Sequence, residues 1–166
     1  MKLLSKFGFG LSVLCGLIAC SPAPETTESQ TQNTETTMSN ETNASQAFLE
    51  ANAKKDGVIV TASGLQYLVM QSGSGKTPGP TDTVKAHYHG TFIDGSVFDS
   101  SVERGAPLDI GVNRVISGWT EALQLMQEGD KWKLFVPSEL AYGKRGTGPI
   151  PADTALIFEV ELIEVK

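Results

Sequence analysis

Three groups of residues in this 166-residue sequence have types and spacing that could support chemistry. The segment Gly73-Ser74-Gly75-Lys76-Thr77 resembles the end of a phosphate-binding loop, but Met70 stands where that motif needs its first glycine. The motif also needs a helix directly afterwards, and Pro78 and Pro80 prevent one. Phosphate binding is therefore rejected.

Two histidines, His87 and His89, lie two residues apart on one face of a predicted strand and could begin a metal site. A catalytic zinc needs three protein ligands, and no third ligand is spaced near this pair. The pair is therefore interpreted as an exposed polar strand face. The sequence predicts no metal and no cofactor.

Asp99, Ser100 and Ser101 follow these histidines and suggest a hydrolase. The sequence has no Gly-x-Ser-x-Gly elbow, and no serine stands on a turn before a helix. Hydrolysis is rejected on these grounds.

The remaining signal is aromatic and apolar, and it centres on Val115-Ile116-Ser117-Gly118-Trp119. Gly118 is expected to allow a sharp change of direction. Trp119 begins a helical pattern, where it could be either a core residue or the floor of an apolar pocket. The other members come from separate segments: Tyr88, Phe98, Asp99, Tyr142, Ile150 and Phe158. Two tyrosines and an aspartate favour a pocket, because each polar tip must find a partner if it is buried.

Alternating apolar and polar residues predict the strands that position these groups. Asp94-Gly95 marks a turn between two strands, and a single helix is expected over about 119–127, with Gly129 after its end. The predicted strands are 65–70, 83–91, 131–136 and 155–165. The pattern predicts an α+β domain, an antiparallel sheet with one short helix on one face.

The N-terminus is predicted to be a lipoprotein signal peptide over residues 1–19. Lys2 and Lys6 precede an apolar run, and Leu17-Ile18-Ala19-Cys20 resembles the bacterial lipobox, in which the cysteine is lipidated. A plain secretory signal with a chance cysteine is the alternative. Ser21 after the cysteine favours the outer membrane over the inner one. Acyl chains on Cys20 would hold the protein on a bilayer.

Residues 20–46 are polar and contain no Lys or Arg, so they are predicted to form a disordered tether. Residues 47–61 are expected to form a short helix and a connector, with Gly57 able to end the helix. The globular domain is expected over 62–166. The formal net charge of −6 argues against nucleic acid as a partner.

Seven short motifs of this domain occur in the order found in the FKBP-type peptidyl-prolyl cis-trans isomerases. The sequence from about Ala62 to Lys166 therefore resembles that family, and Thr61–Tyr67 resembles its macrophage-infectivity-potentiator-like bacterial branch. The motifs are Tyr88-His89-Gly90, Asp94-Gly95, Val97–Ser101, Val115–Trp119, Gly129–Trp132, Leu140–Gly143 and Leu156–Leu162. The resemblance implies a half-wrapped antiparallel sheet with a short helix packed on its concave face.

The resemblance also implies a role for each site residue. Trp119 would be the pocket floor, Asp99 a polar rim residue held by the Tyr88 hydroxyl, and Ile150 a residue of the flap. Tyr142 would donate to ligand carbonyls through its hydroxyl. The walls would be Tyr88, Phe98, Ile110, Val115, Ile116, Tyr142 and Phe158, with Leu108 beside Ile110. Asp99, Tyr142, Phe98 and Tyr88 would be the catalytic residues.

The implied function is isomerisation of bonds before proline in unfolded or nascent polypeptides of the cell envelope, with macrolides as inhibitors. The implied location is the outer membrane, facing the periplasm, with Cys20 as the anchor. Two alternatives remain open: an envelope chaperone or peptide-binding module with little turnover, and a structural lipoprotein scaffold. Relatives in the branch have a helical dimerisation region, whereas only about one helix precedes this domain, so the oligomeric state is left open.

Overall fold

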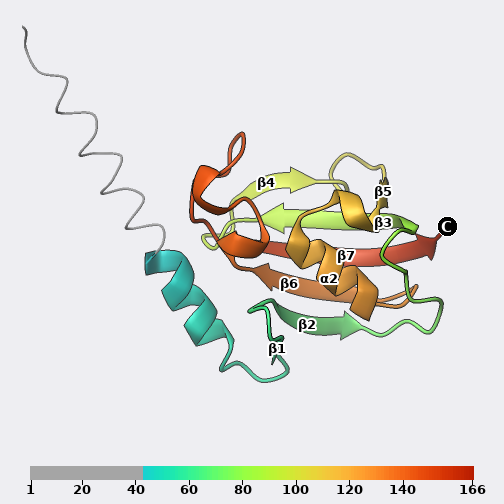
Figure 1. Ribbon diagram of the computed structural model, residues 1–166, viewed down its shortest axis with the longest axis horizontal. Coiled ribbons are helices and arrows are strands. Elements are labelled where there is room, and N and C mark those ends of the chain that lie inside the picture. Colours follow the sequence, from blue (N-terminus) through green and yellow to red (C-terminus); the bar gives the residue numbers. More distant parts are fainter. Residues whose placement is uncertain (1–42) are drawn as a thin grey trace, which may run out of the picture.

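The structure, a computed structural model, describes residues 43–166 (Figure 1). The predicted signal peptide, Cys20 and the tether up to residue 42 lie outside the described residues. The strands are β1 (Ile59–Val60), β2 (Gln66–Gln71), β3 (Thr83–Thr91), β4 (Val97–Ser100), β5 (Leu108–Gly111), β6 (Lys131–Val136) and β7 (Leu156–Val165). The helices are one over residues 43–52, α2 (Ser117–Leu125), and the 3-10 helices η1 (Val112–Arg114), η2 (Ser138–Leu140) and η3 (Gly143–Arg145).

The strands form a single antiparallel sheet in the order β1-β2-β6-β7-β3-β4, and β5 pairs with the first half of β3 (Thr83–Ala86), whereas β4 pairs with its last residues (His89–Thr91). Helix α2 crosses one face of this sheet (Figure 1). The predicted α+β class, a half-wrapped antiparallel sheet with a short helix on its concave face, is confirmed.

The alternation in β3 and β7 determines which face of the sheet meets α2. Val84, Ala86 and Tyr88 are buried, whereas the residues between them are only partly covered. In β7 the same pattern buries Leu156, Phe158, Val160 and Leu162. Tyr88 and Val160 are paired across the two strands, and the pairing keeps one register from Ala86 to Thr91, after a shift between Lys85 and Ala86.

Helix α2 begins two residues earlier than predicted, at Ser117, and ends at Leu125. Its buried face consists of Gly118, Trp119, Ala122 and Leu123. The predicted reason for Gly118 is wrong: it is the second residue of the helix and does not have a positive φ. A Cβ at this position would lie 2.6 Å from Val136 Cγ1, so glycine is needed because the helix lies close against β6.

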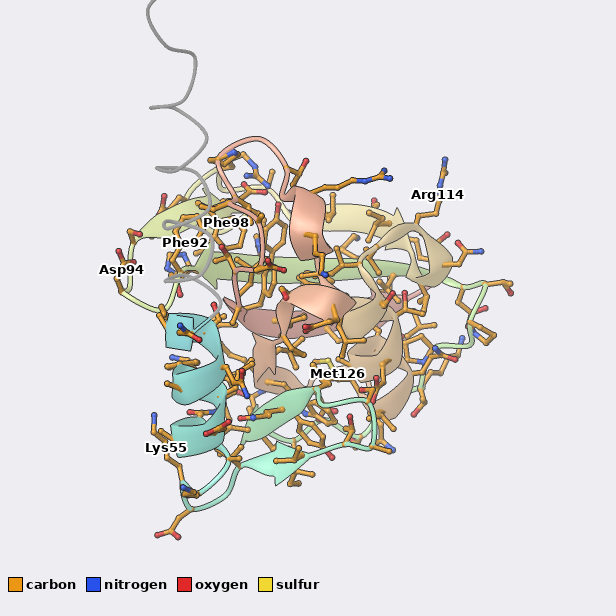
Figure 2. The ribbon with its side chains drawn as sticks, turned by 60° about the vertical axis from the view of Figure 1, so that its left-hand side comes forward. Lys55, Phe92, Asp94, Phe98, Arg114 and Met126 are labelled. Carbon is orange, nitrogen blue, oxygen red and sulfur yellow. The ribbon has the colours of Figure 1, made fainter. Side chains whose placement is uncertain are left out.

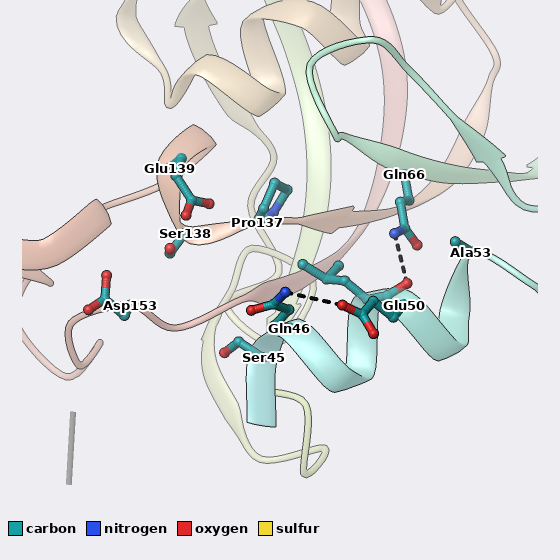
Figure 3. A pocket seen from close by; sticks show the side chains of 10 residues that line it. Ser45, Gln46, Glu50, Ala53, Gln66, Pro137, Ser138, Glu139 and Asp153 are labelled. Atoms are coloured by element: carbon teal, nitrogen blue, oxygen red, sulfur yellow. Dashed lines mark hydrogen bonds between the residues drawn. The ribbon is translucent and has the colours of Figure 1, made fainter. Parts of the chain in front are cut away.

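The N-terminal helix packs on the domain and includes residues that were expected to lie before it. The chain is already helical at residue 43, the first described residue, so residues 43–46, predicted to belong to the tether, are helical. The Ser45 hydroxyl accepts a hydrogen bond of 2.9 Å from the backbone N–H of Ala155, and the rings of Phe48 and Phe135 lie 6.1 Å apart. A cavity of about 360 Å³ lies between this helix and residues 137–139 and 153 (Figure 3).

Within residues 43–166, no helix has both the length and the apolar character required to cross a membrane.

Candidate active site

A cavity of about 380 Å³ opens between β3, β4, β5, α2 and the segment that follows η2. Its lining residues are mostly aromatic or aliphatic, with two charged side chains among them. They are Tyr88, Phe98, Asp99, Leu108, Ile110, Arg114, Val115, Ile116, Trp119, Tyr142 and Phe158. A concave apolar surface with a few polar groups is typical of a binding site.

Trp119 forms the floor and makes two of three aromatic contacts in which the rings meet nearly at right angles. Its ring lies 5.4 Å from Tyr88 at 83° and 5.4 Å from Phe158 at 85°, and Phe98 lies 5.5 Å from Phe158 at 88°. Such edge-to-face pairs are favourable because the positive ring edge meets the negative ring face. Trp119 is only 4% exposed, so it belongs to the core and to the pocket at once.

Gly90 and Phe92 position the Phe98 ring. Gly90 lies opposite Asp99 in the β3–β4 pairing, and a Cβ there would lie 2.6 Å from Phe98 Cζ. Phe92 packs against the Phe98 ring with a centroid distance of 5.1 Å, and Figure 2 shows the two side chains next to each other. Phe98 can therefore stand over the pocket only because residue 90 has no side chain.

A polar corner made by Tyr88, Asp99 and Arg104 edges the pocket. The Tyr88 hydroxyl donates to the Asp99 carboxylate, and Arg104 forms an ion pair with the same carboxylate. Arg104 also donates from Nη2 to the Tyr88 hydroxyl at 2.8 Å, and its guanidinium lies 5.6 Å from the centre of the Tyr88 ring. The Asp99 carboxylate is therefore fixed from two sides.

These contacts determine the charges in the corner. Partial burial raises the pKa of Asp99, but hydrogen bonds from Tyr88 and Arg104 outweigh it and lower the pKa below its usual value. Burial, followed by the hydrogen bond to Asp99, raises the pKa of Tyr88. The hydrogen bonds with Tyr88 and Asp99 raise the pKa of Arg104. At neutral pH Asp99 is ionised and Tyr88 protonated, so the corner supplies a fixed field and does not exchange protons.

Ser101 anchors the turn after β4 to the strand that carries Tyr88. Its hydroxyl is buried, accepts from the backbone N–H of Tyr88 at 2.7 Å and bonds to His87 Nδ1 at 2.9 Å. His89 Nδ1 bonds to the Ser100 hydroxyl at 3.0 Å. The two histidines thus pair with the serines on the far side of the sheet from the pocket. In residues 43–166 no three potential ligands converge on a metal position.

The Gly73–Lys76 segment uses its backbone donors within the protein. Gly73 N–H donates to the Asp130 carboxylate at 2.5 Å. The N–H groups of Ser74 and Gly75 both donate to the Glu128 carbonyl at 3.2 Å. A phosphate cradle requires these donors to be free, so the sequence-based rejection of a phosphate loop agrees with the geometry.

The structure brings together all the predicted site residues except Ile150, and Leu108 joins them. Ile150 lies on the loop after η3 as expected, but its side chain packs in the hydrophobic core and is not among the residues that line the cavity. Its backbone N–H donates to the Thr147 carbonyl at 2.8 Å and closes the loop. Two residues were not predicted: Arg114, which directly precedes the Val115-Ile116 wall, and Arg104, whose position five residues after Asp99 is a weak signal.

The sheet wrapped around α2 and the aromatic pocket define an FKBP-like isomerase domain. The chain belongs to the FKBP-type peptidyl-prolyl cis-trans isomerase family, whose model matches residues 74–163. The model of the domain amino-terminal to FKBP-type peptidyl-prolyl isomerases matches residues 21–69.

Similar proteins fall in the same family. The chain is 56% identical over 119 residues to the FKBP-type peptidyl-prolyl cis-trans isomerase FkpA of Aeromonas hydrophila, covering 72% of this chain and 44% of that protein. It is 57% identical over 119 residues to the FKBP-type 22 kDa isomerase of Escherichia coli K12, covering 71% and 58%, and 53% identical over 121 residues to the outer membrane protein MIP of Legionella longbeachae, covering 72% and 52%. The chain spans about half the length of these relatives.

Solved structures share the fold. The crystal structure of FkpA from Escherichia coli matches with a TM-score of 0.79 and 42% identity, covering 82% of this chain and 64% of that one. A peptidyl-prolyl cis-trans isomerase from Pseudomonas syringae matches with a TM-score of 0.73 and 38% identity, covering 78% and 96%.

Proposed function

We propose that this chain is a peptidyl-prolyl cis-trans isomerase that acts on bonds before proline in unfolded polypeptides. The observation that carries the proposal is the apolar pocket floored by Trp119, with the ionised Asp99 held at its edge by Tyr88 and Arg104. The family membership supports it.

The reaction needs no nucleophile because no bond is broken. The barrier of about 18–20 kcal/mol arises from amide resonance, which rotation about the C–N bond interrupts. A 10⁴-fold acceleration requires about 5.5 kcal/mol of preferential stabilisation of the twisted amide. The planar amide is more polar than the twisted one, so a dry aromatic pocket penalises the ground state more than the transition state.

The pocket residues divide this work. Trp119 presents its ring to the substrate proline, and Phe98 and Phe158 exclude water around it. The Tyr142 hydroxyl and the Ile116 backbone N–H donate to substrate carbonyls, holding them in the twisted arrangement. Ile116 is the N-cap of α2, with φ −60° and ψ 151°, so its N–H lies before the hydrogen-bonded turns of the helix. Tyr142 is 38% exposed and lies at the mouth of the pocket. Asp99 contributes a fixed negative field near the twisting bond.

The proposed location is the bacterial cell envelope, with Cys20 lipidated and the domain on the periplasmic side of the outer membrane. The lipobox-like sequence before Cys20 supports the anchor, and the name of the Legionella longbeachae relative, an outer membrane protein, supports the compartment. The clients would then be proline-containing envelope polypeptides.

A protease-coupled isomerisation assay on a proline tetrapeptide, with and without a macrolide, tests the function. We expect acceleration that a macrolide abolishes. Peptide binding without acceleration would reject the isomerase and favour the peptide-binding module.

A further inference from the structure

The mouth of the pocket carries cationic side chains that have no acidic partner. Within residues 43–166, Arg114, Lys144 and Arg145 are absent from every ion pair. All three are exposed. The formal net charge of the chain is −6, so a group of unpaired cations differs in sign from the chain as a whole.

The backbone places these side chains next to the pocket walls. Arg114 ends η1, lines the cavity itself and directly precedes the Val115-Ile116 wall. Figure 2 shows its side chain extending outward at the edge of the domain. Lys144 and Arg145 form the last turn of η3, and the N-cap of η3 is Tyr142, which lines the cavity. The cations therefore flank the pocket on two of its walls.

Two of the nearby carboxylates are already paired. Asp99 is paired with Arg104, and Asp109 on β5 pairs with Lys166 at 2.8 Å. Asp153 and Glu139 are in no ion pair among the described residues, and both line the separate cavity under the N-terminal helix. Three unpaired cations against these two carboxylates leave the pocket mouth net positive, and the apolar floor behind it strengthens that field.

We propose that this basic mouth makes the site selective for segments that carry a Glu or Asp next to the proline, with Arg114 as the main specificity-determining residue. The inference rests on the proposed function, since it names the substrate class of the same pocket. A carboxylate beside a proline that sits on Trp119 lies within reach of Arg114 or of the two cations of η3. One contact between unit charges in water is enough for about a fivefold preference.

Peptides that differ by one side chain test this selectivity. Two series place Glu, Gln or Lys directly before or directly after the proline, and both kcat/KM for isomerisation and equilibrium binding are measured at low salt with the full chain. In at least one series we expect Glu to exceed Gln by about fivefold and Lys to fall below Gln. In about 0.5 M salt the Glu-to-Gln and Lys-to-Gln ratios should both approach one, because salt screens exposed charges.

Variants locate the source of the preference. Arg114→Gln should reduce the Glu-to-Gln ratio, and adding Lys144→Gln and Arg145→Gln should remove what remains. The matched control is Lys54→Gln, which removes the same charge from an exposed site. Lys54 directly precedes Lys55, which Figure 2 shows on the opposite side of the domain from Arg114. The control should keep the wild-type ratio.

Equal rates and equal affinities for Glu, Gln and Lys peptides in both series would overturn the proposal, and so would a ratio that survives removal of all three cations. If no peptide is isomerised, the proposed function fails, while the binding measurements still decide the charge preference. If the Gln peptides are isomerised without any charge preference, only the selectivity fails.

Discussion

Asn52 of the N-terminal helix donates a hydrogen bond of 3.0 Å from Nδ2 to the Gln66 Oε1 of β2, and both side chains are buried. Gln66 in turn donates from Nε2 to the Leu49 carbonyl of the helix at 2.9 Å. The two amides join the helix to β2, so the helix is part of the domain and not only a linker.

Asn52→Ala should therefore destabilise the whole domain. Removing the donor leaves Gln66 Oε1 buried without its partner, which costs about 1–3 kcal/mol of unfolding free energy. Urea unfolding followed by tryptophan fluorescence measures the change. Gln46→Ala, which removes only an exposed contact with Glu50, serves as the control and should stay within about 0.5 kcal/mol. Equal stabilities of the two variants would mean that the helix is dispensable.

Tyr142→Phe should lower isomerisation about 3–10-fold, because one neutral hydrogen bond to the twisted amide is worth about 1 kcal/mol. The hydroxyl is at the exposed mouth, so the unfolding midpoint should not move. Asp99→Leu and Phe98→Tyr should lower the rate in the same direction. Peptide assays and urea unfolding on the same samples separate the two effects, and wild-type rates from all three variants would reject the site.

Arg104→Gln should raise the pKa of Asp99, because it removes an ion pair that lowers that pKa. In the wild type the folded-state pKa lies below that of the unfolded chain. The ionised carboxylate therefore stabilises the fold at neutral pH, and this contribution is lost as the pH falls from about 4 through the folded pKa. A carboxyl-carbon NMR titration of Asp99 measures the shift directly. An unchanged or lower midpoint in the variant would show that Arg104 does not hold this carboxylate.

Gly90→Ala should displace Phe98 from the pocket wall. The added methyl would lie 2.6 Å from Phe98 Cζ and 3.2 Å from the Asp99 carbonyl, so the ring must move. We expect a stability loss of about 1–3 kcal/mol, typical of overpacking, together with weaker binding of proline peptides. Gly79→Ala is the control, because its Cβ would make only an ordinary contact with Asp82. Wild-type peptide affinity in Gly90→Ala would contradict the proposed role of the ring.

Cys20→Ser should release the protein from membranes. Without the thiol no acyl chain can be attached, and the apolar anchor that holds the chain on the bilayer is lost. Fractionation of cells that express either form, with the domain detected in soluble and membrane pools, measures the change. Continued sedimentation of the variant with membranes would count against lipidation.

The pattern of residues in the sequence was sufficient for the main architecture. Alternation in β3 and β7 predicted the buried face, and the ordered motifs predicted the pocket from Tyr88 to Phe158. The helical state of residues 43–46 was missed because their composition resembles that of the polar tether, whereas contacts such as that of Ser45 with Ala155 hold this part of the helix. Local composition does not reveal a contact between residues 110 positions apart.

The sequence predicted the site less completely for residues that lie on loops, such as Arg104 and Ile150. Arg104 reaches Tyr88 and Asp99 only because the chain after β4 folds back over β3, and no local pattern contains that information. The resemblance placed Ile150 on the flap as a substrate-binding residue; it lies on that loop, paired with Thr147 through backbone hydrogen bonds, but packs in the core and is absent from the cavity lining. A change of direction was expected at Gly118, but the chain enters the helix at the N-cap Ile116, and glycine is needed at residue 118 because of the close packing against Val136.

The position of β7 has a consequence for the order in which the molecule folds. This strand lies between β6 and β3, so the ladders on its two sides are joined within the sheet only through residues Leu156–Val165. During synthesis the strands that precede it can form hairpins and local pairs, but the sheet cannot close until this last strand has left the ribosome. The two parts of the sheet therefore remain unjoined until β7 has been made.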